Sequence, residues 1–251
     1  MEYDVYLNKN KFMKAEKKLI TFVFGTRPEA IKMAPVIKKF KGSNEFNVEI
    51  VLTGQHDELI KPVMDFFKLK GDINFKCMYK GQSLDEITTK ILLKLTNYLN
   101  LKNPSLVFVQ GDTTSALASS MASFYKKIPV SHIEAGLRTD DIYSPFPEEA
   151  NRRIISQLAS LHFTPTQSAY ENLKKDGIRK NVFISGNTIT DALLEVTRKE
   201  TQLIVDKLDI EKDDLVLITV HRRENWGKPL DQIAESILKI SNQHQKLNFL
   251  G

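Results

Sequence analysis

Two carboxylates in this sequence stand where buried strands are expected to end. Asp112 follows the apolar run LVFVQ and Gly111, and Glu134 closes the apolar run PVSHI. Asp is favoured at helix N-caps, so Asp112 also suits a capping role, which is compatible with a role in chemistry. A carboxylate at the end of a buried strand costs free energy unless it is paired or used, and a pair with His132 or Arg138 is the structural alternative for Glu134. Both side chains are candidates for general acid–base chemistry.

The segment FVFGTRPEAIKMAP predicts an anion-binding turn between a strand and a helix. Its apolar run breaks at Gly25, and Pro28 and Glu29 suit a first helical turn. Arg27 and Lys32 bring two cations to the helix N-terminus, where free backbone N–H groups and the helix dipole favour anions. An ordinary strand-to-helix turn is the alternative, because turn glycines are common. The two cations favour a binding function.

A third group of polar residues, His221, Arg222 and Arg223, follows the run LVLITV. At the carboxyl end of a strand these side chains can neutralise a diphosphate leaving group, although a basic surface turn explains them equally well. The sequence has no Cys, His or carboxylate cluster with metal-ligand spacing, so we expect no metal. It also contains neither a dinucleotide-binding glycine fingerprint nor a P-loop.

The elements that must position these residues alternate along the chain. Apolar and β-branched runs predict strands at 19–24, 48–53, 105–110, 129–134, 161–165, 182–185 and 215–220. Helical stretches lie between them at 29–40, 57–67, 84–99, 114–125, 148–158, 167–175, 190–207 and 230–244. Strict alternation predicts an α/β protein with a parallel, doubly wound sheet, in which ligands bind beyond the carboxyl ends of the strands.

The predicted elements fall into one complete domain and part of another. We expect a flexible leader at 1–18, an N-terminal Rossmann-like domain at 19–187 and an incomplete C-terminal Rossmann-like domain at 188–251. One strand, one helix and a strand-like stub cannot cover an α/β sheet. We therefore expect the chain to be a fragment or a truncated reading frame.

The composition is that of a soluble globular protein, with 41% hydrophobic and 27% charged residues. The net charge of +5 raises the question of nucleic acid, but the lysines are scattered along predicted helices, so solvated helix faces explain them better. No apolar run approaches a membrane span, and the first residues lack the apolar core of a secretory signal. The lone Cys77, which we expect in a strand, fits a reducing cytoplasm.

Six short motifs, in the same order, resemble those of the non-hydrolysing UDP-N-acetylglucosamine 2-epimerases. They are GTRPEAIKMAP from Gly25, QGDTT from Gln110, HIEAGLR from His132, SPFPEEANR from Ser144, GNT from Gly186 and HRRE from His221. The resemblance implies a GT-B architecture, with two Rossmann-like domains facing each other across a cleft and the second one truncated here. It also implies a cytoplasmic isomerase of cell-surface polysaccharide biosynthesis that needs no cofactor and forms a homodimer when full length.

The resemblance further implies reversible epimerisation of UDP-N-acetylglucosamine to UDP-N-acetylmannosamine at C2, through elimination and re-addition of UDP. The catalytic residues would be Asp112, Glu134, Glu148 and His221. The substrate-binding residues would be Arg27, Lys32, Asp112, Glu134, His221 and Arg222. Only the resemblance gives Glu148 this role, since it otherwise suits a helix start, and Asn151 and Arg152 are placed to orient it.

Three other residues resemble part of a regulatory site that binds a second UDP-N-acetylglucosamine in some relatives. They are Gln55, His56 and Gln82. The match is incomplete, because Gly81 stands where those relatives have Arg and Glu58 where they have Gln. Two alternatives to the main function stay open: epimerisation of a related UDP-sugar, such as a 2,3-diacetamido uronic acid, and an inactive remnant.

Overall fold

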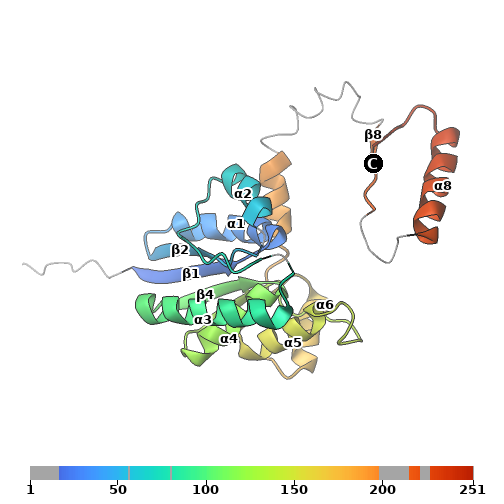
Figure 1. Cartoon of the computed structure of the whole chain (residues 1–251). Coiled ribbons are helices and arrows are strands. Elements are labelled where there is room, and N and C mark those ends of the chain that lie inside the picture. The colour runs from blue at the N-terminus through green and yellow to red at the C-terminus, as the bar shows by residue number, and fades with distance from the viewer. Residues whose placement is uncertain (1–16, 56, 80, 198–214, 221–226, 251) are drawn as a thin grey trace, which may run out of the picture. The chain divides into compact units, whose positions relative to one another are not determined.

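The computed structural model describes residues 17–55, 57–79, 81–197, 215–220 and 227–250. The chain divides into two compact units, Met1–Ala192 and Leu193–Gly251, and each is described by itself (Figure 1). Most of the leader predicted at 1–18 lies outside the described residues, and its last residue, Lys18, is the first residue of a strand.

The first unit contains a seven-stranded sheet in which every neighbouring pair of strands is parallel. Along the sheet the strand order is β3-β2-β1-β4-β5-β6-β7. The strands are β1 (Lys18–Phe24), β2 (Phe46–Leu52), β3 (Ile73–Asn74), β4 (Leu106–Gln110), β5 (Val130–Ile133), β6 (Leu161–Thr164) and β7 (Val182–Ile184). The predicted α/β class with a parallel sheet is therefore confirmed.

One strand of this sheet, β3, was not predicted. It consists of two residues, Ile73 and Asn74, which pair with Val51 and Leu52 at the edge of the sheet. Two residues are too few to show the alternation that marks a strand in a sequence. The prediction that Cys77 lies in a strand is wrong, because this buried residue follows β3 in an irregular segment.

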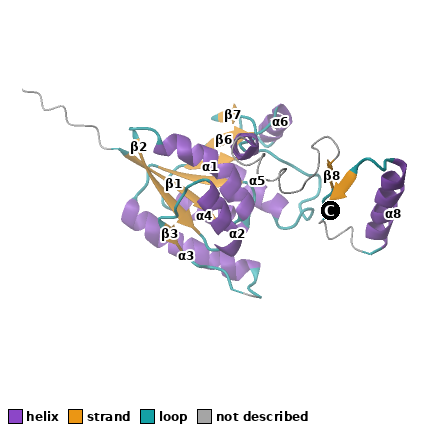
Figure 2. Cartoon of the chain, turned by 90° about the horizontal axis from the view of Figure 1, so that it is seen from above, coloured by secondary structure: helices purple, strands orange, loops and turns teal. Residues whose placement is uncertain are grey.

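Six helices of the first unit connect the strands. They are α1 (Arg27–Lys41), α2 (Asp57–Phe66), α3 (Leu84–Lys102), α4 (Thr114–Tyr125), α5 (Glu148–Leu158) and α6 (Gln167–Lys175). Figure 1 shows α1 and α2 on one side of the sheet and α3, α4 and α5 on the other, and Figure 2 shows α1 lying over β1. Residues 189–197 are also helical, and the rest of the helix predicted at 190–207 lies outside the described residues.

The core of the first unit forms where β1 and β4 pair in the middle of the sheet. Phe22 of β1 stacks on Phe108 of β4 with ring centroids 4.7 Å apart, and Phe40 of α1 packs edge-on against both rings. On the other side, α4 buries small Ala and Ser side chains against α3, α5 and the sheet. Small residues let α4 pack closely against β1 and β4, which pair with each other beneath it.

The second unit has β8 (Leu215–Leu217), α8 (Lys228–Gln243) and β9 (Asn248–Leu250), and the two strands are parallel. None of the side chains of α8 is buried, and Leu230 and Leu238 are 42% and 63% exposed. This unit therefore has an amphipathic helix with an exposed apolar side. Among the described residues, no helix combines the length and apolar character needed to span a membrane.

Candidate functional site

The predicted site lies at the carboxyl ends of β1, β4 and β5. From the central pair β1 and β4, the strand order runs outward in opposite directions along the sheet. The place where the strand order reverses, here between β1 and β4, is called the topological switch point. Open α/β sheets bind ligands in the crevice beyond the carboxyl ends of the strands at this point. The turns that begin at Gly25, Gly111 and Glu134 all lie at this edge.

The turn between β1 and α1 is closed by the carboxylate of Glu29. Its Oε2 accepts hydrogen bonds from the backbone N–H groups of Gly25 (2.9 Å) and Thr26 (2.7 Å). A Cβ on Gly25 would lie 2.0 Å from Thr53 Oγ1, so only glycine fits here. The expectation that these N–H groups are free to bind an anion is wrong, because Glu29 occupies them. The side chain of Arg27 is exposed at the same turn.

Glu134 directly follows β5, and three nitrogen-bearing side chains surround its carboxylate. Lys32 Nζ lies 2.7 Å from Oε1 and 2.6 Å from Oε2. Gln110 Nε2 donates to Oε2 (2.5 Å) and Asn187 Nδ2 donates to Oε1 (2.9 Å). The backbone of Glu134 has φ of +64°, in the left-handed region that is unfavourable for a residue with a Cβ. Such strain persists where the surrounding contacts hold the residue, as these four hydrogen bonds do.

The predicted partners of Glu134 have other contacts. His132 is fully buried, and its Nε2 lies 2.7 Å from the carbonyl oxygen of Gly111. Burial lowers the pKa of His132 to about 3, so the ring is neutral and donates this hydrogen bond. Arg138 instead pairs with Asp176 at 2.8 Å and donates to Ser156. The structural alternative, in which Glu134 pairs with His132 or Arg138, is therefore wrong.

Asp112 is held by two residues of α5. Arg152 Nη2 lies 2.6 Å from its Oδ2, and Asn151 Nδ2 donates to its backbone carbonyl (2.8 Å). Burial raises the pKa of Asp112, the charge of Arg152 opposes that shift, and the charges of Glu134 and Glu148 add to it. The expectation that Asn151 and Arg152 orient Glu148 is wrong, since both contact Asp112. A carboxyl group with a raised pKa is suited to exchanging protons near neutral pH.

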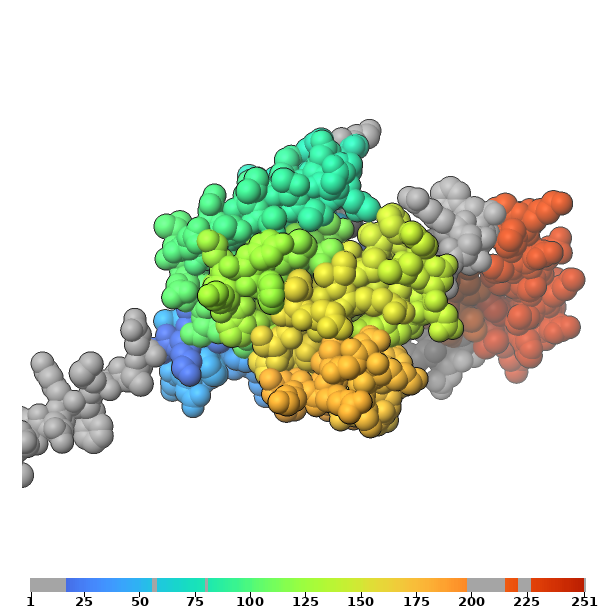
Figure 3. Space-filling view, turned by 90° about the horizontal axis from the view of Figure 1, so that it is seen from below, coloured from blue at the N-terminus to red at the C-terminus, as the bar shows by residue number. Residues whose placement is uncertain are grey.

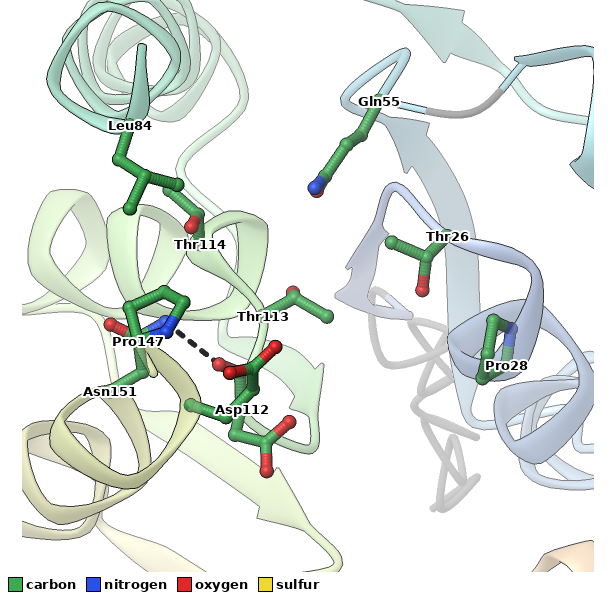
Figure 4. Close-up of a pocket in the computed structure, with 10 residues that line it drawn as sticks. Thr26, Pro28, Gln55, Leu84, Asp112, Thr113, Thr114, Pro147 and Asn151 are labelled. Carbon is green, nitrogen blue, oxygen red and sulfur yellow. Dashed lines mark hydrogen bonds between the residues drawn. The ribbon is translucent and has the colours of Figure 1, made fainter. Parts of the chain in front are cut away.

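A pocket of about 320 Å³ opens beside Asp112 (Figure 4). Its lining residues are Thr26, Pro28, Gln55, Leu84, Asp112, Thr113, Thr114, Pro147, Glu148 and Asn151. Figure 4 shows Asp112 on one side, Thr26 and Pro28 on the other, and Gln55 pointing toward the space between them. The structure thus brings Asp112 and Glu148 into one pocket. Glu134 lies next to it, since a Cβ on Gly111 would be 3.7 Å from Glu134 Oε2.

Of the expected regulatory site, Gln55 and Gln82 belong to the part of the chain that the structure describes, and only Gln55 lines the pocket. Gln55 lines the pocket that contains Asp112, and its Oε1 accepts a hydrogen bond from Ser115 Oγ (2.8 Å). Gln82 accepts one from the backbone N–H of Tyr79 (3.1 Å) and is not among the residues that line this pocket. His56 lies outside the described residues, as do His221 and Arg222 of the predicted substrate site.

Four residues at this edge have contacts that the sequence interpretation missed. Gln110 and Asn187 hold Glu134, and Glu29 accepts a hydrogen bond from Thr113 Oγ1 (2.6 Å). The sequence contained a signal for two of them, because Gln110 ends β4 and Asn187 lies shortly after β7. The carboxyl ends of parallel strands lie at the same edge of a sheet. Across the described ranges, no group of three or more His, Cys, Asp or Glu side chains is arranged to hold a metal ion.

Comparison with known proteins identifies the family. Residues 38–250 match the family model described as UDP-N-acetylglucosamine 2-epimerase. The chain belongs to this family. The family that the six sequence motifs indicated is therefore confirmed.

Three comparisons, with enzymes from two organisms, show how much of a UDP-N-acetylglucosamine 2-epimerase the chain contains. The enzyme of that name from Neisseria meningitidis serogroup A is 44% identical over 237 residues, which are 91% of this chain and 63% of that protein. A crystal structure of the N. meningitidis enzyme bound to UDP-GlcNAc gives a TM-score of 0.84 at 43% identity, over 92% of this chain and 64% of that one. The Methanocaldococcus jannaschii enzyme in complex with UDP-GlcNAc and UDP gives 0.77 at 32% identity, with coverage of 92% and 64%.

These comparisons also confirm the fold class, a GT-B type epimerase fold of which this chain contains the first domain and part of the second. The chain spans less than two thirds of the length of the relatives.

Proposed function

We propose that the protein catalyses reversible epimerisation of UDP-N-acetylglucosamine to UDP-N-acetylmannosamine at C2. The observation that carries the proposal is the pocket at the switch point that contains Asp112 and Glu148. Family membership and relatives crystallised with UDP-GlcNAc and UDP support the choice of substrate. The pocket volume of about 320 Å³ lies near the lower limit for ligand sites, so it accommodates part of a nucleotide sugar.

The proposed reaction proceeds by elimination and re-addition. A carboxylate removes the C2 proton, the C–H electron pair forms the C1–C2 double bond, and the bond from C1 to the UDP oxygen breaks. The intermediate is 2-acetamidoglucal, with UDP as the free anion. A carboxylic acid then delivers a proton to the opposite face of C2 while the UDP oxygen bonds to C1 again. Asp112 and Glu148 are the proposed proton-transferring pair, because both line the pocket and burial raises the pKa of Asp112.

The remaining predicted residues have supporting roles in this proposal. Lys32 and Glu134 form an ion pair next to the pocket, where Lys32 provides positive charge for the departing diphosphate. Glu134 holds Lys32 in place and enters proton transfer only after one of its donors leaves. Arg27, which is exposed, is assigned to the diphosphate together with His221 and Arg222. Gln55 is assigned to substrate contact because it lines the same pocket.

We also propose that the protein forms a homodimer in the cytoplasm. Large apolar side chains are exposed on the outer helices of the first unit, a face that Figure 3 shows from below. They are Leu93 (60%) and Leu101 (85%) on α3, Phe124 (52%) and Tyr125 (63%) at the end of α4, and Ile154 (45%) on α5. Exposed apolar groups of this kind favour association. Light scattering should give twice the chain mass, and Leu93→Glu should reduce it to one chain.

The function can be tested by hydrogen exchange at C2. UDP-N-acetylglucosamine is incubated in D2O with a chimera in which residues 17–250 replace the matching segment of the N. meningitidis relative. NMR then follows loss of the C2 proton and formation of the manno epimer. We expect both to occur, and Asp112→Asn should slow them by about a hundredfold or more. The matched control is Asp65→Asn, the same chemical change at an exposed position of α2.

Two results would contradict the proposal. A folded chimera that binds UDP without exchanging the C2 proton would exclude epimerase chemistry at this site. Equal rates for Asp112→Asn and Asp65→Asn would remove Asp112 from the reaction. The 251-residue chain is tested in parallel, and we expect it to exchange far more slowly than the chimera, because the small pocket surrounds only part of the substrate.

A further inference from the structure

The carboxylate of Glu29 joins two turns on opposite sides of the switch point. Glu29 lies in the first turn of α1 and is only 1% exposed. Its Oε2 accepts from the N–H groups of Gly25 and Thr26, within the β1–α1 turn. Its Oε1 accepts from the hydroxyl of Thr113 (2.6 Å), which belongs to the β4–α4 turn. Two segments that are 84 residues apart are thus tied by one side chain.

The hydroxyl of Thr113 completes this connection. It donates a hydrogen bond to Glu29 and, as the N-cap of α4, accepts one from the N–H of Ala116 (3.0 Å). The first turns of α1 and α4 are therefore joined by one carboxylate and one hydroxyl. Thr113 is also the residue directly after Asp112, so a shift of its backbone moves the carboxylate in the pocket.

Helix capping alone does not account for this arrangement. Glu29 and the N-cap residue Thr26 form a capping box, in which the third residue of the helix accepts from the backbone N–H of the N-cap. Glu86 occupies the same position in the capping box of α3, where it accepts from the N–H of Ser83 (2.9 Å) while remaining exposed. Glu29 is buried, which is costly for a carboxylate, and burial raises its pKa. An exposed glutamate caps a helix equally well. The burial and the additional bond to Thr113 therefore point to a function beyond the cap.

We propose that Glu29 is a positioning residue that, through Thr113, fixes the backbone carrying Asp112 and thereby the contact between Asp112 and Arg152. The proposal rests on the role proposed above for Asp112, but the geometry it concerns can be measured without turnover. The Asp112–Arg152 contact of 2.6 Å is already at the short end of a charge-assisted hydrogen bond. Any displacement therefore weakens the attraction that opposes the raised pKa of Asp112.

The test is an NMR titration of the Asp112 carboxyl group in the 251-residue chain, with its signal identified by its loss in Asp112→Asn. Thr113→Val keeps the shape of the side chain and removes the hydroxyl. We expect it to raise the midpoint by about half a pKa unit or more, as expected when the charges separate by about 1 Å. Glu29→Gln should shift it in the same direction, and Thr113→Ser, which keeps the hydroxyl, should retain the original midpoint. The double variant should shift no further than the larger single shift.

Two variants serve as controls for lost helix capping. Glu86→Gln weakens the capping box at the start of α3, and Thr166→Val removes the N-cap hydroxyl of α6. Both should lower stability and leave the Asp112 midpoint unchanged. The proposal is overturned if Thr113→Val and Glu29→Gln fold and the Asp112 midpoint in both variants lies within about 0.1 pH unit of its value in the unmodified chain. If Thr113→Val does not fold, Thr113→Ala and Glu29→Gln decide the question. Absence of epimerase activity would refute the proposed function and leave the titration result intact.

Discussion

The ammonium group of Lys32 bridges both carboxylate oxygens of Glu134, a residue 102 positions later in the chain. With the amides of Gln110 and Asn187, the carboxylate accepts four hydrogen bonds, about as many as its lone pairs allow. A proton can reach Glu134 only when one donor leaves. In the proposed reaction, an anion that draws Lys32 away would also open an acceptor position on Glu134, so that diphosphate binding and proton transfer would be coupled.

Removing Lys32 should destabilise the first unit. Lys32→Met removes the charged donor from the carboxylate of Glu134, whose side chain is 11% exposed. Only the neutral amide donors of Gln110 and Asn187 remain. We expect urea denaturation to show a loss of about 1–3 kcal/mol. The matched control is Lys102→Met, which breaks the more exposed pair with Glu49 and should cost about 1 kcal/mol or less. Equal losses would mean that the Lys32 pair behaves as a surface contact.

Substitution of the carboxylates should affect rate more than binding. In the chimera described above, Asp112→Asn should lower turnover by about a hundredfold to ten-thousandfold, the typical contribution of a positioned acid or base. Glu134→Gln should also lower turnover, whereas Arg27→Ala should mainly weaken UDP binding, measured by calorimetry. Normal turnover in Asp112→Asn would refute the proposed role of Asp112 in proton transfer, and normal turnover in Glu134→Gln would refute the supporting role of Glu134.

Stability should fall in mild acid because of two buried histidines on neighbouring strands. His132 and His162 face each other in the β5–β6 register, and burial lowers their pKa values to about 3 and about 4. Both bind fewer protons in the folded chain than when unfolded. Their contribution is therefore fully present above about pH 6.5 and is lost as pH falls toward these values. Each should cost about 1.4 kcal/mol per pH unit below 6.5.

Urea titrations at pH 7 and pH 5.5 measure this loss. We expect the free energy of unfolding to drop by about 3 kcal/mol between them, and His132→Gln or His162→Gln to remove about half of the drop. The exposed His244 provides the control, since His244→Gln should leave the pH dependence unchanged. A flat profile in the unmodified chain would contradict the prediction.

Two glycines with positive φ should respond differently to substitution. Gly136 has φ of +87° and a Cβ there would lie 2.2 Å from the carbonyl oxygen of Ala169, whereas Gly177 has φ of +85° and open space around it. Gly177→Ala should therefore cost about 1–2 kcal/mol from the left-handed backbone alone. Gly136→Ala adds a clash with backbone and should cost clearly more in thermal or urea unfolding. Equal losses of stability in the two variants would show that the backbone of α6 moves away from the added methyl group at little cost in free energy.

The sequence predicted elements better than contacts. Apolar periodicity located α4, α5 and α6 at their observed bounds, because each has a clear start signal and an apolar face. It missed β3, since two residues at a sheet edge carry no period. In the site, the expected ends of the strands correctly predicted that Asp112 and Glu134 lie at one edge of the sheet. It did not give their partners, because Lys32 and Arg152 reach them from other segments of the chain.

The position of β1 in the sheet has a consequence for synthesis of the chain. β1 pairs with β2 on one edge, and its other edge pairs with β4, whose residues appear more than eighty positions later, as in Ile20↔Leu106. At about 5–20 residues per second, a ribosome needs on the order of ten seconds to bridge that interval. During this time the apolar strand LITFVF has one unpaired edge, which is a template for strands of other nascent chains. The half of the site carried by β1 therefore depends on protection of that edge until Gln110 has emerged.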